Sequence, residues 1–135
     1  MSAFTNDMES LILNHIFLNT DFTRPGTIYV ALHDADPTDA GTVSEISGNA
    51  YARQPVVTGA SSEWNEVGGG TVDNSGTIEF PAATPSDWGT ITHVSLWNAV
   101  SGGTALFQGV LSSSKIIAAS DIFRFDAGDL DIYFD

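Results

Sequence analysis

The chain has 135 residues, no cysteine, and 17 Asp and Glu against four Lys and Arg, which gives a formal net charge of −13. This length suits one domain, so we expect a single β-rich domain over residues 1–135. The four basic residues are scattered, so neither nucleic acid nor an anionic membrane is an expected partner. Without cysteine, disulfides and Cys-based zinc sites are excluded.

The N-terminal part predicts one short helix, over about residues 5–19. Apolar side chains recur there at steps of three and four from Met8 to Leu18, which is helical spacing. Asn6 followed by Glu9 has the spacing of a capping box. Proline and glycine at 25 and 26 then stop any helix.

From about residue 27 onward the apolar period changes to two, which is typical of strands. Strands are expected at residues 28–33, 51–58, 71–80, 91–98, 105–111, 122–126 and 129–135, with a further short one at 63–65. Pro55 favours an edge position or a bulge for its strand. Residues 91–98 are apolar on both faces, which is typical of a central strand. The pattern predicts a mainly β fold, an antiparallel β-sandwich or barrel-like domain.

Four carboxylates raise the question of a calcium site: Asp34, Asp36, Asp39 and Glu45. Calcium takes six to eight oxygen ligands, and Glu45 lies at position 12 from Asp34, where an EF-hand loop closes with a bidentate Glu. The interior spacing does not match, because Pro37 stands at position 4 and the third carboxylate at position 6. Ordinary Asp-Pro turn chemistry is the alternative. We therefore assign no metal and no cofactor, and keep the four residues only as a calcium candidate.

No catalytic motif is present. His15, His33 and His93 are far apart in the sequence and have no metal-ligand spacing. The chain contains no Gly-x-Ser-x-Gly motif, no phosphate-binding loop and no recognisable Ser and His arrangement. We expect no enzyme.

Three tryptophans are candidates for binding. Trp97 lies on the predicted central strand and Trp88 at a strand entry, so packing is the expectation for both. Trp64 lies in a polar region and is the best candidate for an exposed anchor, since aromatic residues are enriched at interface hot spots. An aligned platform of exposed aromatic rings would instead indicate a carbohydrate-binding β-sandwich module.

The order of several short blocks along the chain resembles a known family. The blocks are residues 29–33 with 35–41, 45–54, 80–84, 88–94, Gly102 with Gly103, Gly109, and 126–131. Together they resemble small tailed-bacteriophage virion proteins, described either as tail-fibre proteins or as head decoration (cement) proteins. The resemblance spans nearly the full length and implies a structural role in the virion without catalysis.

Within that family the size of the chain favours a capsid decoration protein, because a typical tail fibre has a long trimeric shaft with a coiled coil or repeats. Such a subunit would bind the major capsid protein on the head surface, self-associate as a dimer or trimer, and be made in the host cytoplasm. A tail-fibre or tail-tip component is the alternative.

Candidate contact elements for this role are the N-terminal residues 1–5, with Phe4, and the loop 34–49. Arg53 is a candidate for an ion pair with a partner, and pairing with a carboxylate of its own chain is the alternative.

Overall fold

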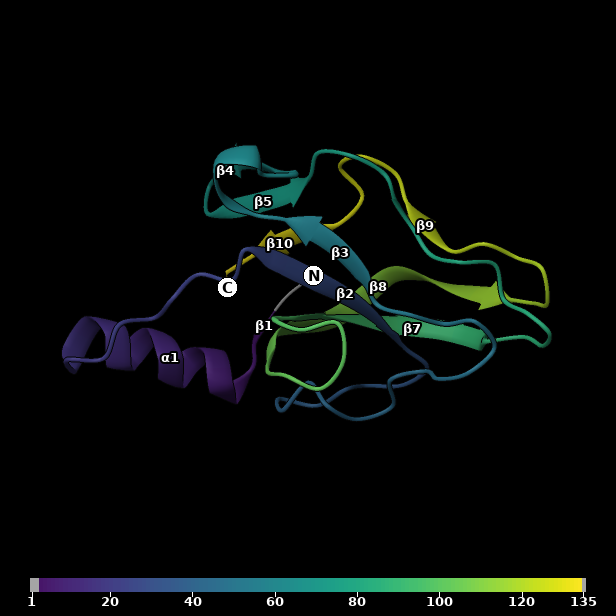
Figure 1. Cartoon of the computed structure of the whole chain (residues 1–135), viewed down its shortest axis with the longest axis horizontal. Coiled ribbons are helices and arrows are strands. Elements are labelled where there is room, and N and C mark those ends of the chain that lie inside the picture. The colour runs from purple at the N-terminus through teal and green to yellow at the C-terminus, as the bar shows by residue number, and fades with distance from the viewer. Residues whose placement is uncertain (1–2, 135) are drawn as a thin grey trace.

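In the computed structural model, residues 3–134 are described and fold into short strands and one α-helix (Figure 1). In chain order the elements are β1 (Ala3–Phe4), α1 (Asn6–Phe17), β2 (Thr27–His33), β3 (Gln54–Val57), the 3-10 turn η1 (Gly59–Ser61), β4 (Trp64–Gly68), β5 (Thr71–Asn74), β6 (Ile78–Glu79), β7 (Gly89–Trp97), β8 (Ala105–Ile117), β9 (Arg124–Phe125) and β10 (Asp131–Tyr133). The predicted mainly β class with one helix near the N-terminus is confirmed.

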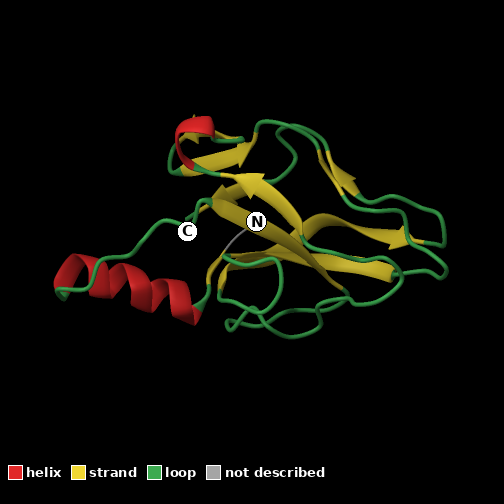
Figure 2. Cartoon of the chain, viewed as in Figure 1, coloured by secondary structure: helices red, strands yellow, loops and turns green. Residues whose placement is uncertain are grey.

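The strands form three antiparallel sheets. A five-stranded sheet has the order β1-β8-β7-β2-β3, a three-stranded sheet the order β10-β5-β4, and β6 pairs with β9. The two smaller sheets lie over one side of the larger sheet, so the arrangement is sandwich-like and not a closed barrel (Figure 2). β7 lies between β2 and β8, as its two apolar faces predict. β3 with Pro55 lies at the sheet edge, as predicted.

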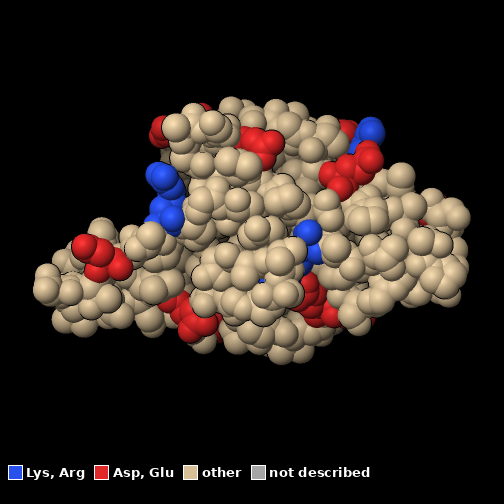
Figure 3. Space-filling view, viewed as in Figure 1, with Lys and Arg blue, Asp and Glu red and all other residues tan. Residues whose placement is uncertain are grey.

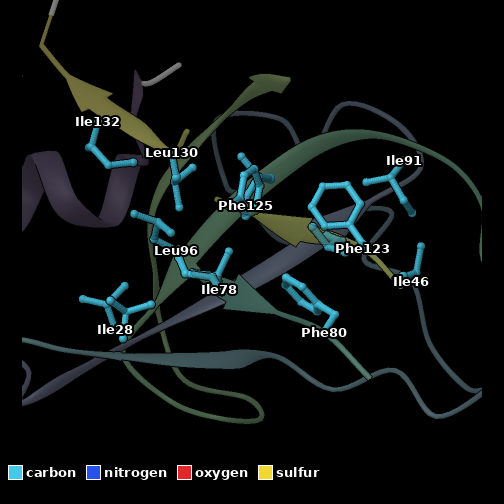
Figure 4. Close-up of a cluster of buried hydrophobic side chains, with 14 of the residues drawn as sticks. Ile28, Ile46, Ile78, Phe80, Ile91, Leu96, Phe123, Phe125, Leu130 and Ile132 are labelled. Atoms are coloured by element: carbon cyan, nitrogen blue, oxygen red, sulfur yellow. The ribbon is translucent and has the colours of Figure 1, made fainter. Parts of the chain in front are cut away.

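The core fills the space between these layers (Figure 4). Ile28 and Leu96 come from the larger sheet, and Phe125 and Ile132 come from the smaller ones. Phe80 is 1% exposed and packs edge-on against Phe123, with ring centroids 5.7 Å apart. As the period-two pattern of the sequence predicts, alternate apolar side chains of the strands point into this core.

Helix α1 begins one residue earlier than its capping box predicts. Thr5, not Asn6, is the N-cap, and its hydroxyl oxygen accepts a hydrogen bond from the amide of Met8 at 3.2 Å. The same hydroxyl donates to the carbonyl of Ala105 at 2.5 Å, so the cap also joins the helix to β8. In the described part of the chain, no helix is long and apolar enough to cross a membrane.

The predicted strand 71–80 is two strands that belong to different sheets. β5 ends at Asn74, whose buried side chain donates to the carbonyls of Gly76 and Asp126 at 2.7 and 2.9 Å. Its amide oxygen accepts from the backbone amide of Leu130 at 2.9 Å. These bonds satisfy backbone groups where the chain passes from one sheet to the next, and the alternation pattern carries no sign of that break.

Strand β8 is longer than predicted, reaching Ile117 instead of residue 111. Its register with β7 shifts between Val110, opposite His93, and Lys115, opposite Ile91. Four residues of β8, 111–114, thus stand opposite Thr92 alone and form an irregular bulge, and bulges tend to occur at sheet edges. Beyond the two residues paired with β1, the outer edge of β8 has no paired strand among residues 3–134.

Candidate interaction surfaces

Arg53 is engaged within its own chain. Its guanidinium makes a two-pronged ion pair with Glu45, at 2.8 and 2.7 Å, and donates to the carbonyls of Ala99 and Gly102 at 3.0 and 2.9 Å. It also lies over the ring of Trp97, 3.8 Å from its centroid. The intrachain alternative for Arg53 is therefore the one observed, and its side chain is only 7% exposed.

This ion pair ties three parts of the fold together. Glu45 lies in the long loop, and its carboxylate also accepts a hydrogen bond from the Tyr51 hydroxyl at 3.0 Å. The Tyr51 oxygen in turn accepts from the backbone amide of Leu32 in β2 at 3.0 Å. Loop 34–49, predicted as a contact element, is thus fixed to the larger sheet through Glu45.

A second polar group lies beside it and is fully buried. His33 and Ser95 are both 0% exposed, with Nε2 and Oγ 2.7 Å apart. His33 Nδ1 lies 2.7 Å from the carbonyl of Val43, which only accepts, so Nδ1 carries the proton and Nε2 accepts from Ser95. Trp97 Nε1 donates to Ser95 Oγ at 2.7 Å. Every polar atom of this Ser-His pair is satisfied inside the protein, and neither residue has exposed surface for a substrate.

The charge states follow from these surroundings. Burial lowers the pKa of His33 below its usual 6.5, against smaller opposing effects of the Val43 hydrogen bond and the Glu45 charge. Burial alone would raise the pKa of Glu45, but the hydrogen bonds and charge of Arg53 outweigh it and the pKa is lowered. Burial, and then the Glu45 charge, raise the pKa of Tyr51. The network thus holds a neutral His33, an ionised Glu45 and a neutral Tyr51.

The four carboxylates named as calcium candidates do not gather around a common point, so the structure does not support a calcium site there. Across residues 3–134 no group of three or more His, Cys, Asp or Glu side chains could hold a metal ion. The Glu45 carboxylate is turned to Arg53, and an Asp36 oxygen accepts from the amide of Thr38 at 2.8 Å. Asp34, Asp36 and Asp39 are exposed, and the segment follows the turn alternative.

Phe4 is part of an aromatic cluster of its own chain. Its ring centroid lies 5.2 Å from that of Phe107 in β8 and 4.6 Å from that of Phe134 near the C-terminus. Phe134 is 61% exposed, so the cluster still reaches the surface. Residues 1–2 of the predicted N-terminal contact element lie outside the described residues.

The tryptophans do not form an exposed platform. Trp88 and Trp97 are 8% and 5% exposed, and Trp64 is half-buried against the core. The indole nitrogen of Trp64 is buried without a hydrogen-bond partner, so the ring faces inward and is not the predicted exposed anchor. The three tryptophans therefore supply no aligned platform of exposed rings of the kind that would favour a carbohydrate-binding module.

A group of exposed apolar residues lies on α1 and its C-cap, where the sequence analysis did not place a site. Leu13, Ile16, Phe17 and Leu18 are 55%, 63%, 75% and 62% exposed, and we call these four residues the helix tip. The opposite side of α1 faces the core through Met8, which is buried, and through partly buried neighbours. The helix projects from the body of the molecule at one end of its long axis (Figure 1). A helical projection of α1 shows apolar residues on both sides of the helix, and this signal could have predicted an exposed apolar face.

A cleft of about 690 Å³ opens between β8 and the segment that contains β9 and β10. Its apolar lining includes Val110, Leu111, Ile122 and Phe123, and Lys115 and Arg124 lie among its polar groups. We call it the lateral cleft. It lies beside the outer edge and the bulge of β8, so its presence depends on the tertiary fold and not on a local sequence motif.

The comparisons with known proteins give a family. The model of the family described as "Podophage GP4 fiber I protein gp80" matches residues 3–133. The chain belongs to this family. No match was found among the curated proteins.

This membership confirms the resemblance on which the sequence analysis relied. The match covers α1 and every strand in full, so it concerns the whole fold. The chain is a bacteriophage virion protein with a structural role.

Proposed function

We propose that the chain is a structural subunit of a tail fibre, or of the fibre's attachment to a podophage-type virion, and that it acts by association without catalysis. The observation that carries this proposal is the family match, whose printed description is a fibre protein, over residues 3–133. The exposed helix tip supports an association role, because large exposed apolar patches usually mark interaction sites. The buried Ser95 and His33 are better explained as a structural network than as a catalytic pair.

Capsid decoration remains a second candidate, favoured by the shape of the chain. Across residues 3–134 the longest helix has 12 residues, and the described strands form no repeated unit that would make a shaft. A small β-rich subunit of this kind suits repeated addition to an assembled head, where many weak contacts to the major capsid protein add up. For either role we expect no nucleic-acid or membrane partner, because the net charge is −13.

Quantitative mass spectrometry of purified virions separates the two roles. Heads and tails are separated, and the ratio of this chain to the major capsid protein is measured in each fraction. A fibre subunit is expected in the tail fraction at a low copy number, and immunogold label should fall at the tail. Stoichiometric copies on heads would instead establish the decoration role, and absence from both fractions would refute a virion role.

A further inference from the structure

The helix tip has the form of a docking helix. Leu13, Ile16 and Phe17 stand at positions i, i+3 and i+4, so they share one face of α1, and all are more than half exposed. This spacing is that of anchor residues in helix-in-groove recognition. Residues 10–20 contain no Asp, Glu, Lys or Arg, although the chain as a whole carries 21 such residues. A charge-free apolar helix end in a strongly acidic protein can be desolvated at little electrostatic cost.

The lateral cleft of the same chain offers a matching groove. Its apolar lining comes from β8 and from the segment that leads into β9, including Val110, Ile122 and Phe123. Val110 and Ile122 are 60% and 51% exposed, so apolar surface is open to a partner. A volume of about 690 Å³ lies within the range of ~300–1,000 Å³ that takes a drug-sized ligand, which is comparable with the few large side chains of the helix tip.

Electrostatics favours a contact between these two surfaces. Two copies that each carry −13 repel one another, so they can meet only where negative charge is sparse. The cleft lining holds two of the four cations of the chain, Lys115 and Arg124, beside three carboxylates, so its formal net charge is only −1. Arg124 is paired with Asp126 at 3.0 Å, whereas Lys115 is in none of the ion pairs found among residues 3–134. An unpaired cation there suits the helix C-terminus, where the helix dipole is negative.

We propose that the helix tip of one copy docks in the lateral cleft of a second copy, with Leu13, Ile16 and Phe17 as anchors. The two surfaces differ, so the contact is head-to-tail and repeats from copy to copy, giving a closed ring or a filament. In the face seen in Figure 3 the projecting end of the molecule is mostly uncharged, with one group of acidic atoms on it. The inference rests on the proposed structural role and names the partner as the same chain.

Because the chain contains no cysteine, single-cysteine variants test the contact directly. Ile16→Cys and Ile122→Cys are purified separately, one of them labelled with ¹⁵N, then mixed and oxidised. Intact-mass measurement is expected to show the mixed disulfide dimer well above either self-linked dimer. Leu13→Cys with Val110→Cys is a second pair in case one variant does not fold. Val67→Cys, at an equally exposed apolar site of β4, is the control and should link to neither partner.

Two results would overturn the proposal. Self-linking of Ile16→Cys as efficient as the mixed link would mean a symmetric helix-to-helix contact. A wild-type chain that sediments as a monomer up to about 1 mM would mean that no self-contact of useful affinity exists. The variant Phe17→Ser is an independent test, because it should weaken self-association measured by sedimentation at least tenfold. The matched variant Val67→Ser should leave self-association unchanged.

These measurements use the purified chain and no virion, so the two proposals can fail separately. If the purified chain does not self-associate but is found in tail fractions, only the docking contact is overturned. If the purified chain self-associates but is absent from virions, the proposed function is refuted instead.

Discussion

Arg53 lies in the interior of the fold, and its contacts suggest a measurable contribution to stability. In Arg53→Ala, Glu45 would remain partly buried without its cation, and the carbonyls of Ala99 and Gly102 would lose their donor. Breaking a buried pair in this way lowers the free energy of unfolding by ~3–5 kcal/mol. Urea unfolding followed by circular dichroism measures the change.

Arg124→Ala is the matched control for that variant. Arg124 and Asp126 also form an ion pair, at 3.0 Å, but their side chains are 57% and 59% exposed. Exposed pairs contribute only ~0–1 kcal/mol, so this variant should unfold almost like the wild type. Equal and small losses in the two variants would contradict the structural role given to Arg53.

His33 makes the stability depend on pH. Its pKa is lowered in the folded state, so the unfolded state binds the proton first as the pH falls below 6.5. The stabilising contribution is complete above pH 6.5 and is lost as the pH falls through the lowered folded pKa. We expect the free energy of unfolding to fall with decreasing pH in this window, by up to about 1.4 kcal/mol per pH unit.

Unfolding measured between pH 7.5 and 5.5 checks this dependence. His33→Gln should flatten the profile. Glu45 acts in the same direction at lower pH, because its pKa is lowered from 4.5 and its contribution is lost on acidification. A wild-type profile that is flat from pH 7.5 to 5.5 would show that His33 does not couple folding to protonation.

At the scale of elements, Thr5 fixes α1 to the larger sheet. Thr5→Val keeps the shape of the side chain but removes both the cap to Met8 and the bond to Ala105. Loss of a cap and of a buried hydrogen bond should lower the free energy of unfolding by ~1–3 kcal/mol, as measured by thermal or urea unfolding. Thr5→Ser retains the hydroxyl and should lose less, and a larger loss in Thr5→Ser would count against the hydrogen bonds as the cause.

Two like charges face each other between β5 and β10. Asp73 and Asp131 are directly opposed in the antiparallel pair, so their side chains lie on the same face, and one oxygen of Asp73 is buried without a hydrogen-bond partner. Asp131→Asn removes the repulsion and supplies a possible donor, so it should raise the free energy of unfolding by ~0.2–1 kcal/mol. The contrasting variant is Glu79→Gln, because Glu79 lies opposite Arg124 and should gain nothing. Unfolding of both variants in one buffer makes the comparison.

At the scale of the whole molecule, the net charge of −13 opposes any contact between copies. Raising the ionic strength from 0.1 M to 1 M shortens the Debye length from about 10 Å to about 3 Å. If copies join through the helix tip, added salt should therefore strengthen self-association several-fold, because screened repulsion outweighs the loss at Lys115. Analytical ultracentrifugation at several salt concentrations measures this. Weaker association at high salt would indicate contacts dominated by ion pairs.

Local patterns in the sequence determined much about this protein. Period-two alternation placed most strands, Pro55 marked an edge, and two apolar faces marked β7 as central, since these features depend on a residue and its near neighbours. The order of short blocks was enough to identify the family that the match over residues 3–133 confirms.

The tertiary structure alone decided the rest. Arg53 and Glu45 are eight residues apart, but they meet Trp97 from a distant part of the chain. The split between β5 and β6 depends on Asn74 bonding to residues more than 50 positions away. The lateral cleft lies between β8 and the C-terminal segment, and the helix tip is exposed because no described part of the chain covers that side of α1. Such features depend on which distant segments pack together, and neither spacing nor composition records that.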